Sequence, residues 1–116
     1  DRILKSWQHD LAELATCPNV STKMSGLFMP VLGHNFYQTR TLATKANVIE
    51  RVLPLIQHAL QCFGKNRVMF ASNFPMDRVN ADLSTLLDAL SDIVHTLDST
   101  ALQPVFYHNA KAFYRL

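Results

Sequence analysis

The order of the expected secondary structure limits the fold of this chain most strongly. Apolar residues recur at helical spacing over residues 3–15, 47–63 and 83–97. Two short strand-like segments, residues 19–25 and 67–72, lie between these helices. Strands that are separated by helices pair in parallel, so the pattern predicts an α/β protein built from parallel βα units.

Two strands are too few for a parallel sheet, which is normally covered by helices on both faces. The chain has 116 residues, and Asp1 and Arg2 lead directly into the first helix. We therefore expect residues 1–116 to be part of one larger domain, in which other strands complete the sheet.

A long segment without helical or strand periodicity, residues 27–45, follows the first expected strand. Loops of this length in compact domains are often functional. Gly33 would permit hinge motion, and aromatic residues such as Phe36 would cover a ligand. These features predict a lid that carries His34 to the site.

Composition excludes several classes of partner. The chain is 48% hydrophobic and 17% charged, with a net charge of +2. Its basic residues are scattered and its apolar runs are short, so we expect no nucleic-acid partner and no membrane partner. Cys17 and Cys62 lack metal-binding spacing and are expected to be buried thiols in the reducing cytoplasm.

Three stretches together resemble one protein family. They are residues 7–27, which end in Ser-Gly-Leu, residues 63–77, which contain Ala-Ser-Asn-Phe-Pro, and residues 109–116 at the end of the chain. Their order and spacing are similar to those of the C-terminal part of the amidohydrolase-related family, which includes lactone hydrolases and some decarboxylases. Met29-Pro30 and Gly33-His34 are similar to one subgroup of it.

The resemblance implies that residues 1–116 are the C-terminal portion of a single (β/α)₈ TIM barrel, a fold of roughly 250 residues. It further implies a hydrolase in which an activated water attacks a small lactone, ester or amide. The partners would be that small-molecule substrate and the rest of the barrel, and a homo-oligomer is compatible with the sequence. The fragment itself is expected to be inactive.

Asn73 occupies the position of a family carboxylate on the last strand, which binds metal or activates water. A carboxamide is neutral and cannot act as a base at ordinary pH. Asn73 is therefore the candidate catalytic residue of an altered site. Alternatively, the barrel has lost hydrolytic chemistry, or Asn73 is a turn residue ahead of Pro75.

Lys23, Ser25 and His34 are the candidate substrate-binding residues. Lys23 and Ser25 point the same way near the end of the first strand, where Lys23 could meet a substrate carboxylate or form a surface ion pair. Asp77 could line the site or pair with Arg78 in an exposed loop.

The family places a His-x-His pair on its first strand, and this sequence has none. We therefore assign no metal ligands here, although a divalent metal such as zinc is compatible with the complete protein. The competing hypothesis is a non-catalytic helical binding module.

Overall fold

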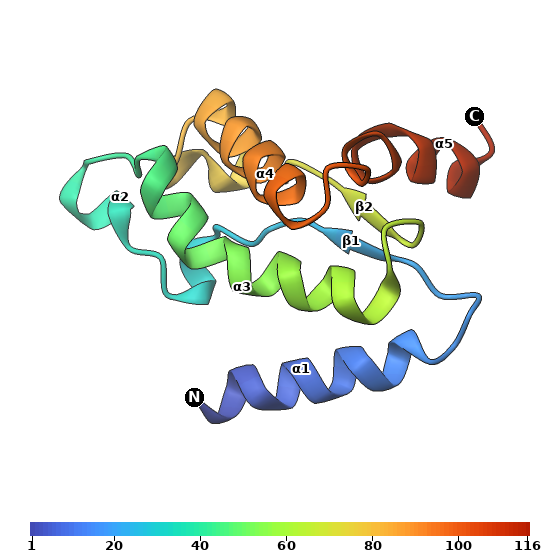
Figure 1. Cartoon of the computed structure of the whole chain (residues 1–116). Coiled ribbons are helices and arrows are strands. Elements are labelled where there is room, and N and C mark those ends of the chain that lie inside the picture. The colour runs from blue at the N-terminus through green and yellow to red at the C-terminus, as the bar shows by residue number, and fades with distance from the viewer.

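The computed structural model describes all residues, 1–116, and places two short strands at the centre of the molecule (Figure 1). β1 (Thr22–Met24) and β2 (Val68–Phe70) pair in parallel, with Lys23 opposite Met69. The chain is therefore an α/β protein with parallel strands, as predicted. The helices are α1 (Arg2–Ala15), α2 (Phe36–Thr39), α3 (Lys45–Phe63), α4 (Leu83–Leu97) and α5 (Asn109–Tyr114), the last preceded by a π-helix (Pro104–His108).

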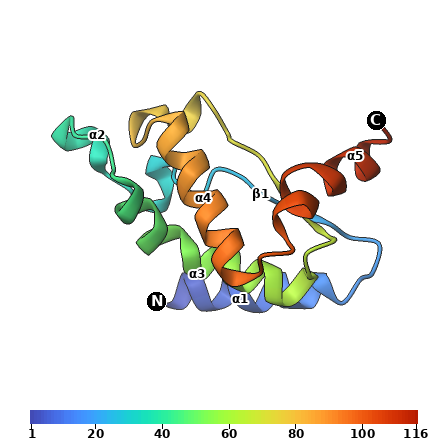
Figure 2. The same ribbon diagram turned by 45° about the horizontal axis from the view of Figure 1, so that its top comes forward.

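The longest helix, α3, packs against α1 on one side and α4 on the other (Figures 1 and 2). Its start is fixed by a capping box, in which the Thr44 hydroxyl accepts from the backbone N–H of Asn47 at 3.2 Å and the Asn47 side chain accepts from the Thr44 N–H at 3.0 Å. Gly64 ends the helix with a positive φ of 72°, which suits glycine.

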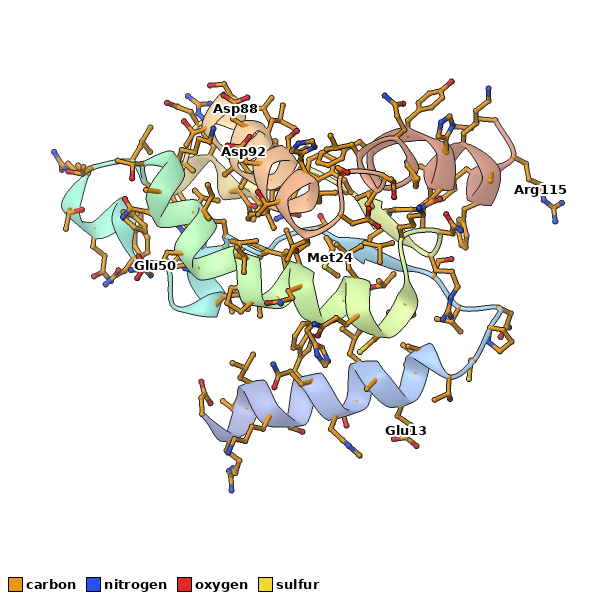
Figure 3. The ribbon with its side chains drawn as sticks, in the orientation of Figure 1. Glu13, Met24, Glu50, Asp88, Asp92 and Arg115 are labelled. Carbon is orange, nitrogen blue, oxygen red and sulfur yellow. The ribbon has the colours of Figure 1, made fainter.

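The core lies between the strands and these helices. Met24 points into it, whereas Glu13 and Asp92 point outward (Figure 3). Fully buried apolar side chains of α3 and α4 meet Val68 of β2 there, and burying each of the larger ones contributes about 1.5–3 kcal/mol. The residues that α3 and α4 bury are Val48, Val52, Ile56, Ala59, Phe63, Leu86, Ala89, Leu90, Ile93 and Val94.

Arg67, just before β2, joins segments that are far apart in the sequence. Its guanidinium donates to the backbone oxygens of Ala15 and Val20 at 3.0 Å and of Cys17 at 2.9 Å. Its Nε donates to the Phe63 oxygen at 3.2 Å. One side chain therefore fixes the end of α1, the turn before β1 and the end of α3.

Several details differ from the sequence expectations. Both strands are shorter than predicted, because each has only one partner strand and the ladder covers three residues. The segment 27–45 contains 3₁₀-helix Pro30–Leu32 and helix α2, which are too short to show periodicity. Pro54 does not break α3, because it is exposed and water can satisfy the carbonyl freed by its missing N–H.

The prediction of two buried thiols was wrong for Cys17. Both cysteines are free, but Cys17 is exposed in the turn that follows α1, and Cys62 is half-buried. None of the helices combines the length and the apolar character needed to cross a bilayer.

The isolated chain should associate with itself. Its sheet has only two strands, so each has an edge without a strand partner, and large apolar side chains such as Ile3 (78% exposed) and Val31 (77% exposed) face solvent. We expect oligomers or aggregates in sedimentation velocity of residues 1–116. A dilute sample that stays monomeric and unfolds in one sharp thermal transition would contradict this.

Candidate functional site

A pocket of about 600 Å³ lies at the edge of the sheet where both strands end. Ser25 directly follows β1, Asn73 lies shortly after β2, and His34 comes from the segment that follows β1. All three candidate residues line this pocket. Ligands of parallel α/β proteins bind at the carboxyl ends of strands, because the loops there can vary without disturbing the core.

Asn73 adopts a left-handed backbone conformation with φ 55°, which asparagine tolerates better than most residues. Its amide nitrogen donates to Oδ1 of Asp77 at 2.9 Å. That bond orients the carboxamide and leaves its carbonyl oxygen to accept from a ligand or a water. Gly26 packs against this amide, since a Cβ there would lie 3.3 Å from Asn73 Nδ2 and 2.9 Å from Met29 Sδ.

Asp77 is buried, with 1% of its surface exposed, so an exposed pair with Arg78 is excluded. The sequence does not predict this burial, because the burial of a single carboxylate depends on which segments pack over it. Burial raises the pKa of the Asp77 carboxyl, and hydrogen bonds from Asn73 and from the Phe28 backbone oppose that rise. Asp77 lies behind Asn73 and does not line the pocket.

His34 is almost buried, stacked on Phe28 with ring centroids 4.4 Å apart. Its Nε2 lies 2.9 Å from the carbonyl oxygen of Leu27, which can only accept, so Nε2 carries the proton. Its Nδ1 lies 3.4 Å from Nη1 of Arg51. Burial lowers the pKa of His34, and the Arg51 charge acts in the same direction. The ring is therefore neutral near pH 7, and both of its nitrogens are occupied.

Asn80 fastens the segment 27–45 to the rest of the molecule. It is fully buried; its side-chain nitrogen donates to the oxygens of Phe28 at 2.9 Å and His34 at 3.2 Å, and its side-chain oxygen accepts from Tyr37 N–H at 3.2 Å. Its backbone oxygen accepts from Ala43 N–H at 2.8 Å. Most of this segment is therefore a fixed wall of the pocket.

Residues 29–33 are the part of the segment that suits a mobile lid. Val31 is 77% exposed, and Gly33 has a φ of 90° with no atoms close to where a Cβ would be. The lid stays a prediction, and these two observations favour residues 29–33 over the rest of the segment.

Lys23 does not line the pocket, unlike Ser25. It lies earlier on β1, is exposed, and places its Nζ 5.6 Å from the ring centroid of Tyr114 on α5. In this chain Lys23 thus makes a surface cation–π contact and is apart from the other three candidates.

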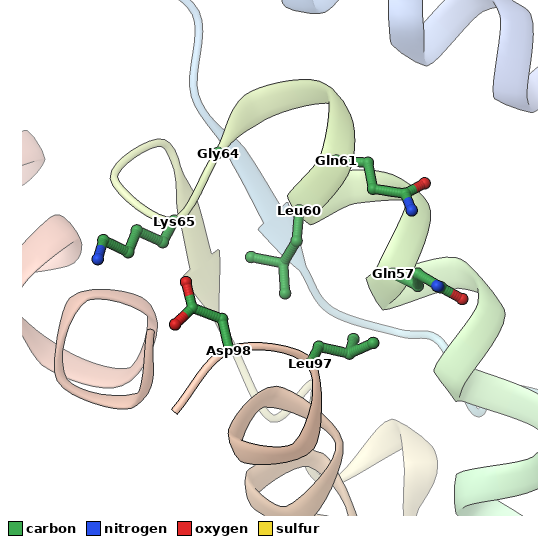
Figure 4. A pocket seen from close by; sticks show the side chains of 7 residues that line it. All are labelled: Gln57, Leu60, Gln61, Gly64, Lys65, Leu97 and Asp98. Atoms are coloured by element: carbon green, nitrogen blue, oxygen red, sulfur yellow. The ribbon is translucent and has the colours of Figure 1, made fainter. Parts of the chain in front are cut away.

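A second pocket, of about 310 Å³, lies at the opposite end of the strands (Figure 4). It is formed by the ends of α3 and α4 and by the turn before β2, with Gln57, Lys65 and Asp98 in its lining. Residues at the amino ends of parallel strands contribute to stability more often than to chemistry. We therefore assign the site to the first pocket.

The residues of this chain do not form a metal site by themselves. No three His, Cys, Asp or Glu side chains come together. At the pocket, Asn73 offers one neutral oxygen, both ring nitrogens of His34 are occupied, and Asp77 faces Asn73.

Sequence reasoning missed Arg51 and Asn80, and it did not predict the burial of Asp77. Arg51 belongs to α3 and lines the pocket, although helical periodicity places it only on a polar face. The spacing of Asp77 from Asn73 was visible, but its burial was not. The partners of Asn80 lie 43 to 52 residues away, a distance that no local pattern reveals.

Comparisons with known proteins identify the family of this chain and one relative. A family model described as Amidohydrolase matches residues 3–116. The chain is 31% identical over 112 residues to the uncharacterized protein y4mH of Sinorhizobium fredii, covering 97% of this chain and 33% of that protein. The chain thus spans about a third of the curated relative that it matches.

The fold is similar to part of a solved amidohydrolase from Burkholderia multivorans. Its crystal structure with bound zinc matches with a TM-score of 0.81 at 23% identity, over 100% of this chain and 39% of that one. A second crystal form with bound HEPES matches with a TM-score of 0.80, over 97% of this chain and 37% of that one.

Proposed function

This chain belongs to the amidohydrolase family, and on that premise we propose that residues 1–116 form the C-terminal part of a (β/α)₈ barrel hydrolase. The complete protein would hydrolyse a small lactone, ester or amide. The single observation that carries the proposal is that Ser25, His34 and Asn73, from three separate segments, line one pocket at the carboxyl edge of the strands.

In this proposal the chain binds and orients the substrate, and other segments supply the group that activates water. Asn73 accepts a hydrogen bond through its carbonyl oxygen, either from the attacking water or from the substrate. It cannot take up the proton, because a carboxamide is not a base at ordinary pH. His34 holds its neighbours in place, since both of its nitrogens are engaged.

If the complete protein uses a divalent metal such as zinc, most of its ligands come from outside this chain. Asn73 would then contribute one neutral oxygen at most. The family fold and the pocket are equally compatible with a barrel that binds its ligand without turnover, and the neutral Asn73 favours that second candidate.

The complete protein should hydrolyse members of a panel of small lactones, esters and amides. Asn73→Ala should lower kcat/KM by about 100-fold, because it removes an oriented polar group at the reacting atoms. Asn66→Ala, at an exposed asparagine outside the pocket, is the matched control and should retain full activity. The isolated chain should be inactive. Binding without turnover by a folded complete protein would favour the second candidate.

A further inference from the structure

The guanidinium of Arg51 is held in the wall of this pocket by two contacts. On one side its Nη1 lies 3.4 Å from Nδ1 of His34. In the second contact, a cation–π contact, its Cζ lies 4.9 Å from the ring centroid of Phe36. Arg51 is otherwise exposed, and these two contacts orient its guanidinium within the pocket wall.

Neither contact neutralises the charge. The protonated Nε2 of His34 donates to the Leu27 oxygen, so Nδ1 of the neutral ring can only accept a hydrogen bond from Arg51. The Phe36 ring carries no charge. The remaining N–H groups of the guanidinium are left to donate to something else.

No carboxylate of this chain forms a salt bridge with Arg51. The salt bridge of the chain joins Lys45 of α3 and Asp92 of α4. Asp1, the other charged side chain in the pocket lining, accepts from the Ile3 N–H as the cap of α1. Arg67, in contrast, donates four hydrogen bonds to backbone oxygens.

The rest of the pocket is mainly apolar, with Trp7, Leu27 and Leu55 among its lining residues. An uncompensated guanidinium in such a wall matches a ligand with an apolar body and one planar anionic group. We propose that Arg51 binds the carboxylate of a small, largely apolar substrate, presenting the rest of that substrate to Ser25 and Asn73. This inference rests on the proposed function, in that it takes this pocket as the substrate pocket.

Phenylacetate and its neutral isostere phenylacetamide test the inference. In calorimetric titrations of the complete protein, phenylacetate should bind about tenfold to hundredfold more tightly than the amide, as expected for charge-assisted hydrogen bonds. Arg51→Gln should abolish that preference. Arg51→Lys keeps the charge but loses the planar fork, and should give an intermediate preference.

The matched control is Arg115→Gln, which removes the same charge from the C-terminal end, where the side chain points away from the molecule (Figure 3). It should bind both probes as the unmodified protein does. Equal affinity for the two probes, or an Arg51→Gln protein with an unchanged preference, would overturn the inference. If Arg51→Gln does not fold, an undiminished preference in Arg51→Lys would do the same.

These outcomes are separate from those of the proposed function. Binding is measured without turnover, so a carboxylate preference can be found in a protein that hydrolyses nothing. Conversely, if the complete protein turns over lactones but shows no dependence on Arg51, the hydrolase stands and the carboxylate site does not.

Discussion

Replacing Asn80 by alanine should lower the free energy of unfolding of the complete protein by about 2–4 kcal/mol, because it leaves three backbone groups without partners, two of them from buried hydrogen bonds. These are the oxygens of Phe28 and His34 and the N–H of Tyr37. The same change should loosen the pocket wall and reduce ligand binding. Denaturant unfolding at pH 7 measures the first effect, and titration with phenylacetate measures the second.

One further variant at Asn80 and one at an exposed control site complete this measurement of stability. Asn80→Asp has the same size but loses both donors, and its carboxylate would face two carbonyl oxygens, so it should destabilise at least as much as alanine. Asn66→Ala, at an exposed site, should change stability by no more than about 0.5 kcal/mol. A loss below about 1 kcal/mol in both Asn80 variants would show that water replaces these bonds.

Asn73→Asp should destabilise the complete protein by about 2–3 kcal/mol at pH 7, since it places a second carboxylate beside the buried Asp77. In the unmodified chain the amide nitrogen of Asn73 lies 2.9 Å from Oδ1 of Asp77. Two carboxyl groups this close share a proton, which raises the folded-state pKa of the pair above its unfolded value. The lost stability should therefore return as the pH falls toward about 4.

The exchange of both residues, Asn73→Asp with Asp77→Asn, should recover most of the loss, because an amide again donates to a carboxylate. A coupling free energy of at least about 1 kcal/mol in the double-mutant cycle is expected. Asn66→Asp is the matched control for added charge. The exchange also places a hard anionic donor at the pocket edge, so zinc content should rise if other segments supply ligands. Additive effects of the two substitutions would mean that these side chains are not in contact.

The parts of this structure that were predictable depend on local periodicity or on topology. The leucine spacing of α4 gave its bounds, Leu83–Leu97, as the structure has them. The meeting of Ser25 and Asn73 at one pocket follows from parallel pairing, because consecutive parallel strands end at the same edge of a sheet. The position of His34 follows in turn, since its segment begins at that edge.

What could not be predicted depends on contacts between distant segments. Asp77 is a charged residue in the connection between β2 and α4, and only packing over that connection buries it. The expectation for Cys17 was wrong for the opposite reason, because an apolar thiol can lie in a turn that nothing covers. The proposed role of Arg51 could not be predicted, because it depends on the contact between its guanidinium and the Nδ1 atom of His34, seventeen positions earlier.

The contacts of Arg67 bear on how proteins of this shape could exchange parts by recombination. Its partners Ala15 and Cys17 lie at the end of α1, ahead of β1, so a crossover between α3 and β2 would pair that arginine with foreign backbone. A chimaera that swaps α1 through β2 as one block keeps every bond of this side chain. The segment that can be exchanged as one block is therefore longer than a single βα unit. Recombination breakpoints should be tolerated before α1 or after β2.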